Sequence, residues 1–442
     1  MKQEPEMHET PIIEMQNEQV LSRPGTYASP LGSVSARSHL DKACGKTIYP
    51  SDLGLSGTLV GKVLHSPYPH CIIHAIHTEQ ASRLPGVHAI LTARDIPGVN
   101  KDVKTIADQP FLAEDRARTV MDALALVAAE SEAAAQAALH TIRLDLQPIP
   151  AVFDPVEALQ PEAVQVHPNG NLAYQFQILH GDVEAGLQEA QVIIENDYTF
   201  PWIEHAYLET EAALAAPSED GTLTIWLGSH DIYSDRAGLS LGFGWPEERF
   251  RVILLPPGGS FGGKHVPIGF YAALLAQRTN RPVHIHYSRA ESLRGHPKRS
   301  PMRIHHRLGA NKDGRLVAAD IEILGDTGAY LHWAPLILDF CSIQATGPYR
   351  LPHARVTGRL VYTNNIIASG MRALGTPQVE FAAESQMDQL ANRLGMHPLK
   401  LRWINALREG DTMITGRLAP GVAFAQTIQA AARSIGLELG EV

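Results

Sequence analysis

Cysteine is scarce in this chain, whose 442 residues include only three, Cys44, Cys71 and Cys341, far apart in the sequence. No Cys-X-X-Cys pair occurs, and both iron–sulfur clusters and cysteine-bound zinc need clustered thiolates. The chain therefore cannot build either centre from its own residues. Because isolated cysteines are typical of buried free thiols in a reducing compartment, we expect a cytoplasmic protein.

Long apolar runs and an excess of positive charge are absent as well. No stretch approaches the roughly 18 apolar residues of a membrane-spanning helix, and the first residues are polar and acidic, unlike a signal peptide. The formal net charge of −10 gives no general attraction for polyanions. We therefore expect no membrane and no nucleic acid as a partner.

The composition is otherwise that of a soluble globular protein, with 44% hydrophobic and 19% charged residues, and the length predicts two or three domains. Residues 1–38 are polar and contain proline, which predicts an extended tail. Residues 39–154 alternate short strands with helices and predict an α/β domain. Prolines crowd the next stretch and predict a connection at 155–171. Residues 172–442 predict a mixed α+β domain.

Apolar periodicity and turn residues place the individual elements. Strands are predicted at 57–65, 87–92, 119–129, 192–200, 222–227, 251–255, 282–287, 302–308, 316–324 and 354–362. Helices are predicted at 131–139, 181–190, 268–278, 381–394 and 423–433. Ser131 is positioned to cap the first of these helices, and Gly395 ends the fourth.

One loop concentrates glycine. The segment Pro256-Pro-Gly-Gly-Ser-Phe-Gly-Gly-Lys264, called the glycine-rich loop below, lies between a predicted strand and a predicted helix. Glycine tolerates positive φ and has no Cβ, so such a loop lets a ligand approach backbone N–H groups. Lys264 is not followed by Ser or Thr, which excludes the phosphate loop of nucleotide hydrolases, and no early Gly-X-Gly-X-X-Gly supports flavin or nicotinamide binding. A ligand cradle and a plain strand-to-helix turn both remain open.

Histidine and glutamate clusters offer further candidates. Two pairs of histidines fall on predicted strands, and the first pair would share one strand face, as metal ligands can. They are His284, His286, His305 and His306. Basic residues between 289 and 299 make a cation site unattractive, so we interpret these histidines as structural. The glutamates at 204, 209 and 211 could serve in acid–base chemistry, but we interpret them as supporting polar residues.

Several motifs follow one another along roughly residues 40 to 410. Leu64-His-Ser-Pro-Tyr-Pro-His-Cys-Ile72 and Leu84-Pro-Gly-Val-His-Ala-Ile-Leu-Thr-Ala-Arg-Asp-Ile-Pro-Gly98 precede the glycine-rich loop, and Asp326-Thr-Gly-Ala-Tyr330 and Met371-Arg-Ala-Leu-Gly-Thr-Pro-Gln378 follow it. Their order resembles the molybdenum-binding part of the xanthine dehydrogenase and aldehyde oxidase family of molybdenum hydroxylases. The resemblance implies an α+β fold, in which an a/b hammerhead domain is followed by the first molybdopterin-binding domain.

The resemblance also implies a cofactor site. In that family a pterin dithiolene holds molybdenum, and the protein contacts the other metal ligands without coordinating the metal itself. It places Phe261 and Gly262 at the molybdenum, and Arg372 as the other close contact, mainly through its backbone. Ser260 stands where the family often has glycine. His230 stands where the family usually has a glutamine that hydrogen-bonds a metal oxo ligand, and imidazole can also donate one hydrogen bond.

Three further positions depart from the xanthine-specific members. His265 replaces a glutamate that recognises the purine, which suggests a different substrate edge or an anionic substituent. Phe340 lies near where those enzymes place an arginine, and Leu374 lies where they place a stacking phenylalanine. Each difference could be a packing substitution alone. Together they argue against xanthine itself as the substrate.

The resemblance finally implies partners. The family's catalytic base is a glutamate of a second molybdenum-binding domain, which we do not find before Val442. We therefore expect no catalytic residue in this chain, and a partner subunit with the second half of the site, as in nicotinate dehydrogenase-like members; a truncated product is the alternative. Iron–sulfur clusters and FAD are expected on partner subunits, and the pterin is expected as its cytosine dinucleotide.

The implied reaction is the hydroxylation by water of an electron-poor carbon in a nicotinate- or purine-like N-heterocycle. Two alternatives stay open. One is an aldehyde-oxidising member with the same cofactor. The other is a non-catalytic subunit that binds partner chains and lacks an active metal site.

Overall fold

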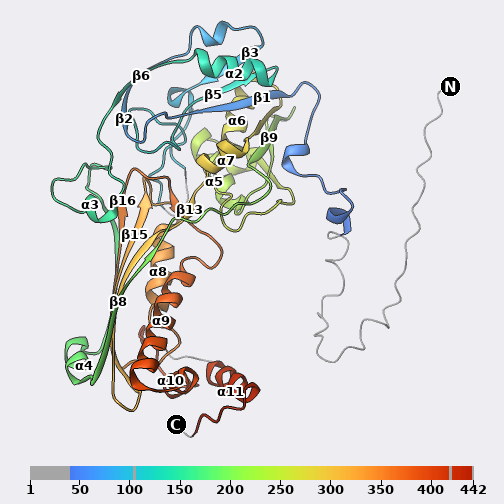
Figure 1. The fold of residues 1–442 in the computed structure, drawn as a ribbon. Helices are drawn as coiled ribbons and strands as arrows, with labels where there is room; N and C mark the ends of the chain where they lie inside the picture. The colour runs from blue at the N-terminus through green and yellow to red at the C-terminus, as the bar shows by residue number, and fades with distance from the viewer. Residues whose placement is uncertain (1–39, 103–105, 418–420, 441–442) are drawn as a thin grey trace, which may run out of the picture. The chain divides into compact units, whose positions relative to one another are not determined.

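The strands of this computed structural model pair mainly into two large sheets (Figure 1). The structure describes residues 40–102, 106–417 and 421–440, so the predicted tail at 1–38 lies outside the described residues. The chain divides into two units, Met1–Ile48 and Tyr49–Val442, and all features below belong to the second.

The first large sheet has seven strands in the order β11-β10-β9-β12-β1-β5-β3. Their bounds are β1 Leu59–His65, β3 Val87–Leu91, β5 Ala123–Ala129, β9 Ala212–Pro217, β10 Leu223–Leu227, β11 Phe250–Leu254 and β12 Val283–His286. β1 runs parallel to β12, with Leu59 opposite Val283. The strands of the predicted first domain therefore continue directly into a sheet built by residues 212–286.

The second large sheet has five strands in the order β7-β16-β15-β14-β8. Their bounds are β7 Leu172–His180, β8 Val192–Phe200, β14 Met302–Ala310, β15 Leu316–Gly328 and β16 His353–Tyr362. Helices α8 (Ala334–Gln344) and α9 (Thr376–Leu394) pack beside this sheet (Figure 1). Their buried residues, such as Leu338 and Met387, share one hydrophobic core with Ile304 and Val356 of the sheet.

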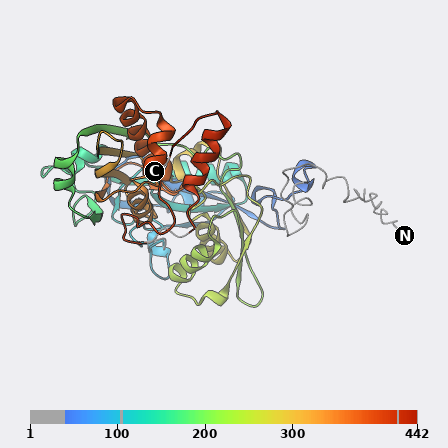
Figure 2. The same cartoon turned by 90° about the horizontal axis from the view of Figure 1, so that it is seen from below.

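Two smaller sheets and the remaining helices complete the described residues. The strands are β2 Cys71–His77, β4 Arg116–Ala117 and β6 Arg143–Pro148 in one sheet, and β13 Lys298–Arg299 with β17 Ala368–Ser369 in the other. The helices are α2 Glu132–Thr141, α3 Pro155–Ala158, α4 Val183–Glu189, α5 Ile232–Phe243, α6 Ile268–Thr279, α7 Arg289–Gly295, α10 Pro398–Asn405 and α11 Phe424–Ser434. The red C-terminal helices α10 and α11 lie side by side (Figure 2) and share a small core.

The predicted strands and helices are all present, and several ends differ. The strand predicted from residue 119 begins at Ala123, because residues 119–122 form a turn closed by the hydrogen bond from Asp122 N to Thr119 O. The helix predicted from residue 381 begins at Thr376, directly after Gly375, whose φ is 83°. Ser131 caps α2 by accepting a hydrogen bond from Ala134 N, and Gly395 ends α9 with φ 64°, both as predicted.

None of the described helices combines the length and the apolar character needed to cross a lipid bilayer.

The buried Asp122 and the half-buried Asp108 join residues 106–122 to the second large sheet and its loops. Asp122 accepts hydrogen bonds from Arg118 N at 2.6 Å and from the Tyr330 hydroxyl at 3.0 Å. Asp108 accepts from Leu331 N at 2.8 Å and from the Tyr362 hydroxyl at 2.9 Å. Burial raises the pKa of Asp122 to about 6, against the effect of these hydrogen bonds.

This raised pKa predicts a pH-dependent stability. Asp122 stabilises the fold fully below pH 3.8, its unfolded pKa, and this contribution is lost as pH rises through about 6. The amide of Asp122→Asn can keep an oxygen facing the same donors but does not titrate. We therefore expect the free energy of unfolding to fall with rising pH by up to about 3 kcal/mol less in the variant than in wild type.

The measurement is the difference in the free energy of urea unfolding between wild type and variant, from pH 4 to pH 7. Wild type and variant must be compared because histidines also change the stability between pH 4 and pH 7. Burial lowers the pKa of His65 to about 4, for example, so its contribution to the free energy of unfolding rises with pH where that of Asp122 falls. A difference that does not change with pH would contradict the prediction.

Candidate functional site

A cavity of about 310 Å³ opens where the glycine-rich loop meets residues 370–374. Its lining consists of His230, Phe261, Gly262, His265, Trp333, Gly370, Met371, Arg372, Ala373 and Leu374. Six of the eight site residues predicted from the sequence are in this lining. The other two, Ser260 and Phe340, are not. The structure therefore gathers segments separated by up to about 140 residues around one hollow.

Strand directions explain why these segments meet. β10 and β11 are parallel, so the residues that follow them, including His230 and the glycine-rich loop, leave at the same edge of the seven-stranded sheet. β9 is antiparallel to β10, so residues 204–211, which precede β9, arrive at that edge. β12 is antiparallel to β9, so the chain toward His296 leaves there too.

The cavity has two walls, the glycine-rich loop and residues 370–374. A short strand pair connects the second wall to the same end of the sheet. β13 follows α7 and pairs in parallel with β17, and residues 370–374 come directly after β17. Arg299 of β13 donates hydrogen bonds to Arg372 O at 2.9 Å and to Gln378 Oε1 at 3.3 Å. This anchoring role of the buried Arg299 was not predicted from the sequence.

Both walls contain left-handed backbone. In the glycine-rich loop φ is 50° at Phe261 and 95° at Gly262, and in the facing loop φ is 73° at Ala373 and 44° at Leu374. Such conformations are uncommon outside glycine and persist where the surrounding structure fixes them. Within the described residues, the N–H groups of Gly262 and Ala373 donate no hydrogen bond, so they are available to a ligand in the cavity.

The two walls are in direct contact. Arg372 N donates a hydrogen bond to Phe261 O at 2.8 Å. A Cβ atom at Gly262 would lie 2.7 Å from Gly370 O and 3.1 Å from the Cα of Met371. Glycine is therefore required at 262 both for its positive φ and for the close approach of the opposite backbone.

Two imidazole rings of the lining, those of His230 and His265, are followed by a third, His332, which is buried behind the lining. The ring centroids of His230 and His265 are 5.0 Å apart, and those of His265 and His332 are 5.4 Å apart. The Trp333 ring lies 5.2 Å from His265 on another side. His230 N donates to Lys264 O at 3.2 Å, which fixes His230 against the glycine-rich loop. His332 and Trp333 were not predicted as site residues.

The two predicted residues outside the lining differ in burial. Phe340 lies on α8 with 39% of its surface exposed. Ser260 precedes Phe261, and its O accepts a hydrogen bond from Gly263 N at 2.8 Å. The Ser260 Oγ atom is buried and has no hydrogen-bond partner within the described residues.

Residues 204–211, called the floor below, do not line the cavity but contact both the glycine-rich loop and residues 370–374. His205 Nε2 lies 3.0 Å from Gly370 O, so this nitrogen carries the proton and donates. His296 Nε2 lies 2.6 Å from Glu204 Oε1, and Lys298 Nζ lies 2.6 Å from Glu204 Oε2. Burial opposes ionisation of Glu204, but the hydrogen bond from Lys298 and further donors lower its pKa to about 2.

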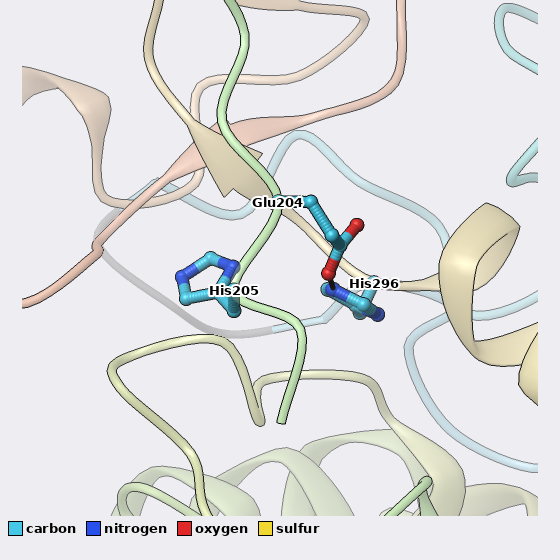
Figure 3. Close-up of side chains that lie close together, drawn as sticks. All are labelled: Glu204, His205 and His296. Carbon is cyan, nitrogen blue, oxygen red and sulfur yellow. Dashed lines mark hydrogen bonds and ion pairs between the residues drawn. The ribbon is translucent and has the colours of Figure 1, made fainter. Parts of the chain in front are cut away.

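Glu204, His205 and His296 are close enough to hold a cation, with ligand atoms within 4.8 Å of one another (Figure 3). The Lys298 ammonium, however, already neutralises the Glu204 carboxylate. We therefore interpret the three residues as a hydrogen-bonded network that connects the floor to both walls. This agrees with the interpretation of Glu204 from the sequence as a supporting polar residue.

The first predicted pair of histidines, His284 and His286, has hydrogen-bond partners within the protein. His284 and His286 stack on β12, with ring centroids 6.2 Å apart. His284 Nε2 lies 3.1 Å from Pro50 O, and His286 Nε2 lies 2.9 Å from Thr210 Oγ1. The structure thus places this pair on one face of a strand, as the spacing predicts, with each ring hydrogen-bonded to protein.

Family models match most of the chain. Residues 166–406 match a molybdopterin cofactor-binding domain. Residues 44–150 match the a/b hammerhead domain of aldehyde oxidase and xanthine dehydrogenase.

Several known proteins are similar over most of this chain. It is 42% identical over 395 residues to a probable xanthine dehydrogenase subunit of Bacillus subtilis (strain 168), a match that covers 89% of this chain and 53% of that protein. It is 32% identical over 394 residues to the nicotinate dehydrogenase large molybdopterin subunit of Eubacterium barkeri, a match that covers 89% of this chain and 93% of that protein.

Solved structures show the same fold. The aldehyde oxidoreductase from Desulfovibrio gigas superposes with a TM-score of 0.85 at 31% identity, over 90% of this chain and 45% of that one. Quinoline 2-oxidoreductase from Pseudomonas putida 86 gives 0.84 at 25% identity, over 90% and 53%. The chain thus spans about half the length of three of these four proteins and most of the fourth.

The contact between the walls predicts the effect of a side chain at position 262. Gly416 also has positive φ, 74°, but a Cβ there would meet nothing within 4 Å. We expect Gly416→Ala to cost about 1–2 kcal/mol for the left-handed backbone alone. Gly262→Ala should cost clearly more, because the Gly370 carbonyl must also move. Urea unfolding of both variants tests this, and equal costs would contradict it.

Proposed function

Because the chain belongs to the xanthine dehydrogenase and aldehyde oxidase family and carries its molybdopterin-binding domain, we propose that it forms one part of the molybdenum site of a hydroxylase. The proposed reaction hydroxylates an electron-poor carbon of an N-heterocycle, with water as the source of oxygen. The observation that supports this most directly is the cavity between two backbone loops that offer N–H donors.

The residues around the cavity fit a molybdenum–pterin group. Such a group brings its own sulfur ligands and needs hydrogen-bond donors from the protein more than metal-coordinating side chains. Among the described residues, the lining contains no cysteine and no carboxylate, while Gly262 and Ala373 present N–H groups. The Oγ of Ser260, next to Phe261 in the chain, is buried without a hydrogen-bond partner among the described residues and adds a donor. When bound, the group supplies the two-electron oxidation.

The chain's own residues would hold and orient this group. Phe261 and Gly262 would approach it with the backbone, because Gly262 has no Cβ that would obstruct the approach. Arg372 would approach it from the other wall, held between Phe261 O and Arg299. His230, pinned to Lys264 O, would donate one ring N–H toward its oxygen ligand.

The substrate would lie among aromatic and imidazole rings. His265 and Trp333 offer a hydrogen-bonding edge and a flat apolar face, which suit a planar heterocycle. Leu374 adds an aliphatic contact from the opposite wall. Phe340 lies outside the lining, and we propose that it borders the entrance from α8.

Further subunits complete the proposed enzyme. The absence of a carboxylate from the lining supports a catalytic base on a partner chain with the second molybdopterin-binding half. Electrons would leave through iron–sulfur and FAD subunits, since the three cysteines of this chain cannot form a cluster. We also propose the cytosine dinucleotide form of the pterin, a cytoplasmic location, and the domain boundaries given by the sequence.

A second candidate activity is aldehyde oxidation. Similarity to the aldehyde oxidoreductases of Megalodesulfovibrio gigas and Desulfovibrio gigas supports it, and the same cofactor site would serve. A panel of nicotinate, purines and aromatic aldehydes, assayed by dye reduction, separates the two activities.

The cofactor proposal is tested by metal analysis. We expect the complex purified with its co-expressed neighbouring subunits to contain about one molybdenum and one pterin per copy of this chain. Inductively coupled plasma mass spectrometry and pterin fluorescence provide the two measurements. A complete complex without molybdenum would refute the enzymatic function and leave a subunit that only binds its partners.

The substrate pocket is tested at His265. We expect His265→Ala to lower kcat/KM for the accepted heterocycle about 10-fold or more, because the ring offers the substrate a polar edge. His74→Ala, at an exposed residue of β2, serves as the control. An unchanged substrate profile in His265→Ala would remove this residue from the pocket.

A further inference from the structure

One carboxylate oxygen of Glu209 contacts both Gly258 and Lys264, the two ends of the central part of the glycine-rich loop. Glu209 Oε2 accepts a hydrogen bond from Gly258 N at 2.7 Å. The same oxygen forms an ion pair with Lys264 Nζ. The backbone reinforces this contact, because Glu209 N donates to Gly258 O at 3.2 Å. The seven residues from 258 to 264, which include Phe261 and Gly262, are therefore closed into a ring by one side chain.

This ion pair is shielded from solvent. The side chains of Lys264 and Glu209 are only 2% and 8% exposed. Lys264 Nζ also lies 5.3 Å from the centroid of the Tyr207 ring, on the same floor segment. Within the described residues the second oxygen of Glu209 has no hydrogen-bond partner. The polar contacts of this carboxylate are thus directed at the loop, where low dielectric strengthens them.

The loop also fits the floor sterically. A Cβ at Gly258 would lie 2.5 Å from Glu209 Cβ, and one at Gly259 would lie 2.9 Å from Tyr207 Cβ. A Cβ at Gly263 would lie 2.9 Å from the His205 ring. Three of the loop's glycines therefore face residues 205–209, while Phe261 and Gly262 face the cavity.

We propose that Glu209 is the positioning residue of the glycine-rich loop. It holds Gly258 and Lys264 at a fixed separation, and this forces the residues between them into the left-handed turn at Phe261 and Gly262. The Gly262 N–H, which donates no hydrogen bond within the described residues, thereby stays available to a ligand in the cavity. Glu209 touches neither cofactor nor substrate, and its consequence for turnover rests on the proposed function.

Hydrogen exchange of the full chain tests the positioning directly and does not depend on turnover. We expect Glu209→Gln to speed exchange in peptides covering 256–264 about 10-fold, because the amide keeps an acceptor for Gly258 but loses the charge that holds Lys264. Peptides covering α9 should be unchanged. The control is Asp320→Asn, which breaks the ion pair of another buried carboxylate, with Arg355 in the other large sheet.

Two further variants keep the test informative. Lys264→Met removes the other half of the pair, and the double variant Glu209→Gln/Lys264→Met completes a thermodynamic cycle. We expect each single variant to speed exchange of the loop, and the double variant to show less than the combined effect. If Glu209→Gln does not fold, Lys264→Met provides the same comparison.

Turnover provides a separate outcome. In the molybdenum-loaded complex we expect Glu209→Gln to lower kcat with little change in KM, since the substrate contacts at His265 are kept. Wild-type exchange rates at 256–264 in Glu209→Gln would overturn the positioning role, whatever the metal content. A wild-type complex without molybdenum would instead overturn the proposed function and leave the exchange result standing.

Discussion

The directions of four adjacent strands are the constraint on which the candidate site depends. β10 and β11 run parallel, β9 runs antiparallel to β10, and β12 runs antiparallel to β9, so that His230, the glycine-rich loop and residues 204–211 all enter or leave at one end of the sheet. Reversal of any one strand would carry its segment to the opposite edge. The local features of the site, from the positive φ of Phe261 to the hydrogen bond between Arg372 and Phe261, presuppose this shared edge.

Sequence reasoning succeeded where the determining interactions are local. Ser131 caps α2 and Gly395 ends α9 because capping depends on a few neighbouring residues. β9 was missed because its alanines carry no strand preference, and it is a strand only through pairing with β10 and β12 on either side. β7 and α8 were missed as well, and both are defined by their packing against β16 in the core of the second sheet.

In the candidate site, too, residues within sequence motifs were predicted and residues defined by distant contacts were not. Phe261, Gly262 and Arg372 could be named from ordered motifs, and the structure brings them together around one cavity. No role could be assigned to Arg299, His332 or Trp333 from the sequence, because their roles arise from contacts between segments far apart in the sequence. Glu209 was interpreted from the sequence as one of three supporting polar glutamates, without a partner. Its pairing with Lys264, 55 positions later, is a property of the folded sheet edge.

The parallel pairing of β1 with β12 has a consequence for the order of events during synthesis. Leu59 pairs with Val283, so the module of strands β1, β5 and β3, which is complete at Ala129, keeps an open strand edge until about 150 further residues, from 129 to 283, have been synthesised. Contacts of such long sequence separation form slowly. The nascent chain therefore passes through a state with an unpaired apolar edge, the kind of surface that molecular chaperones cover.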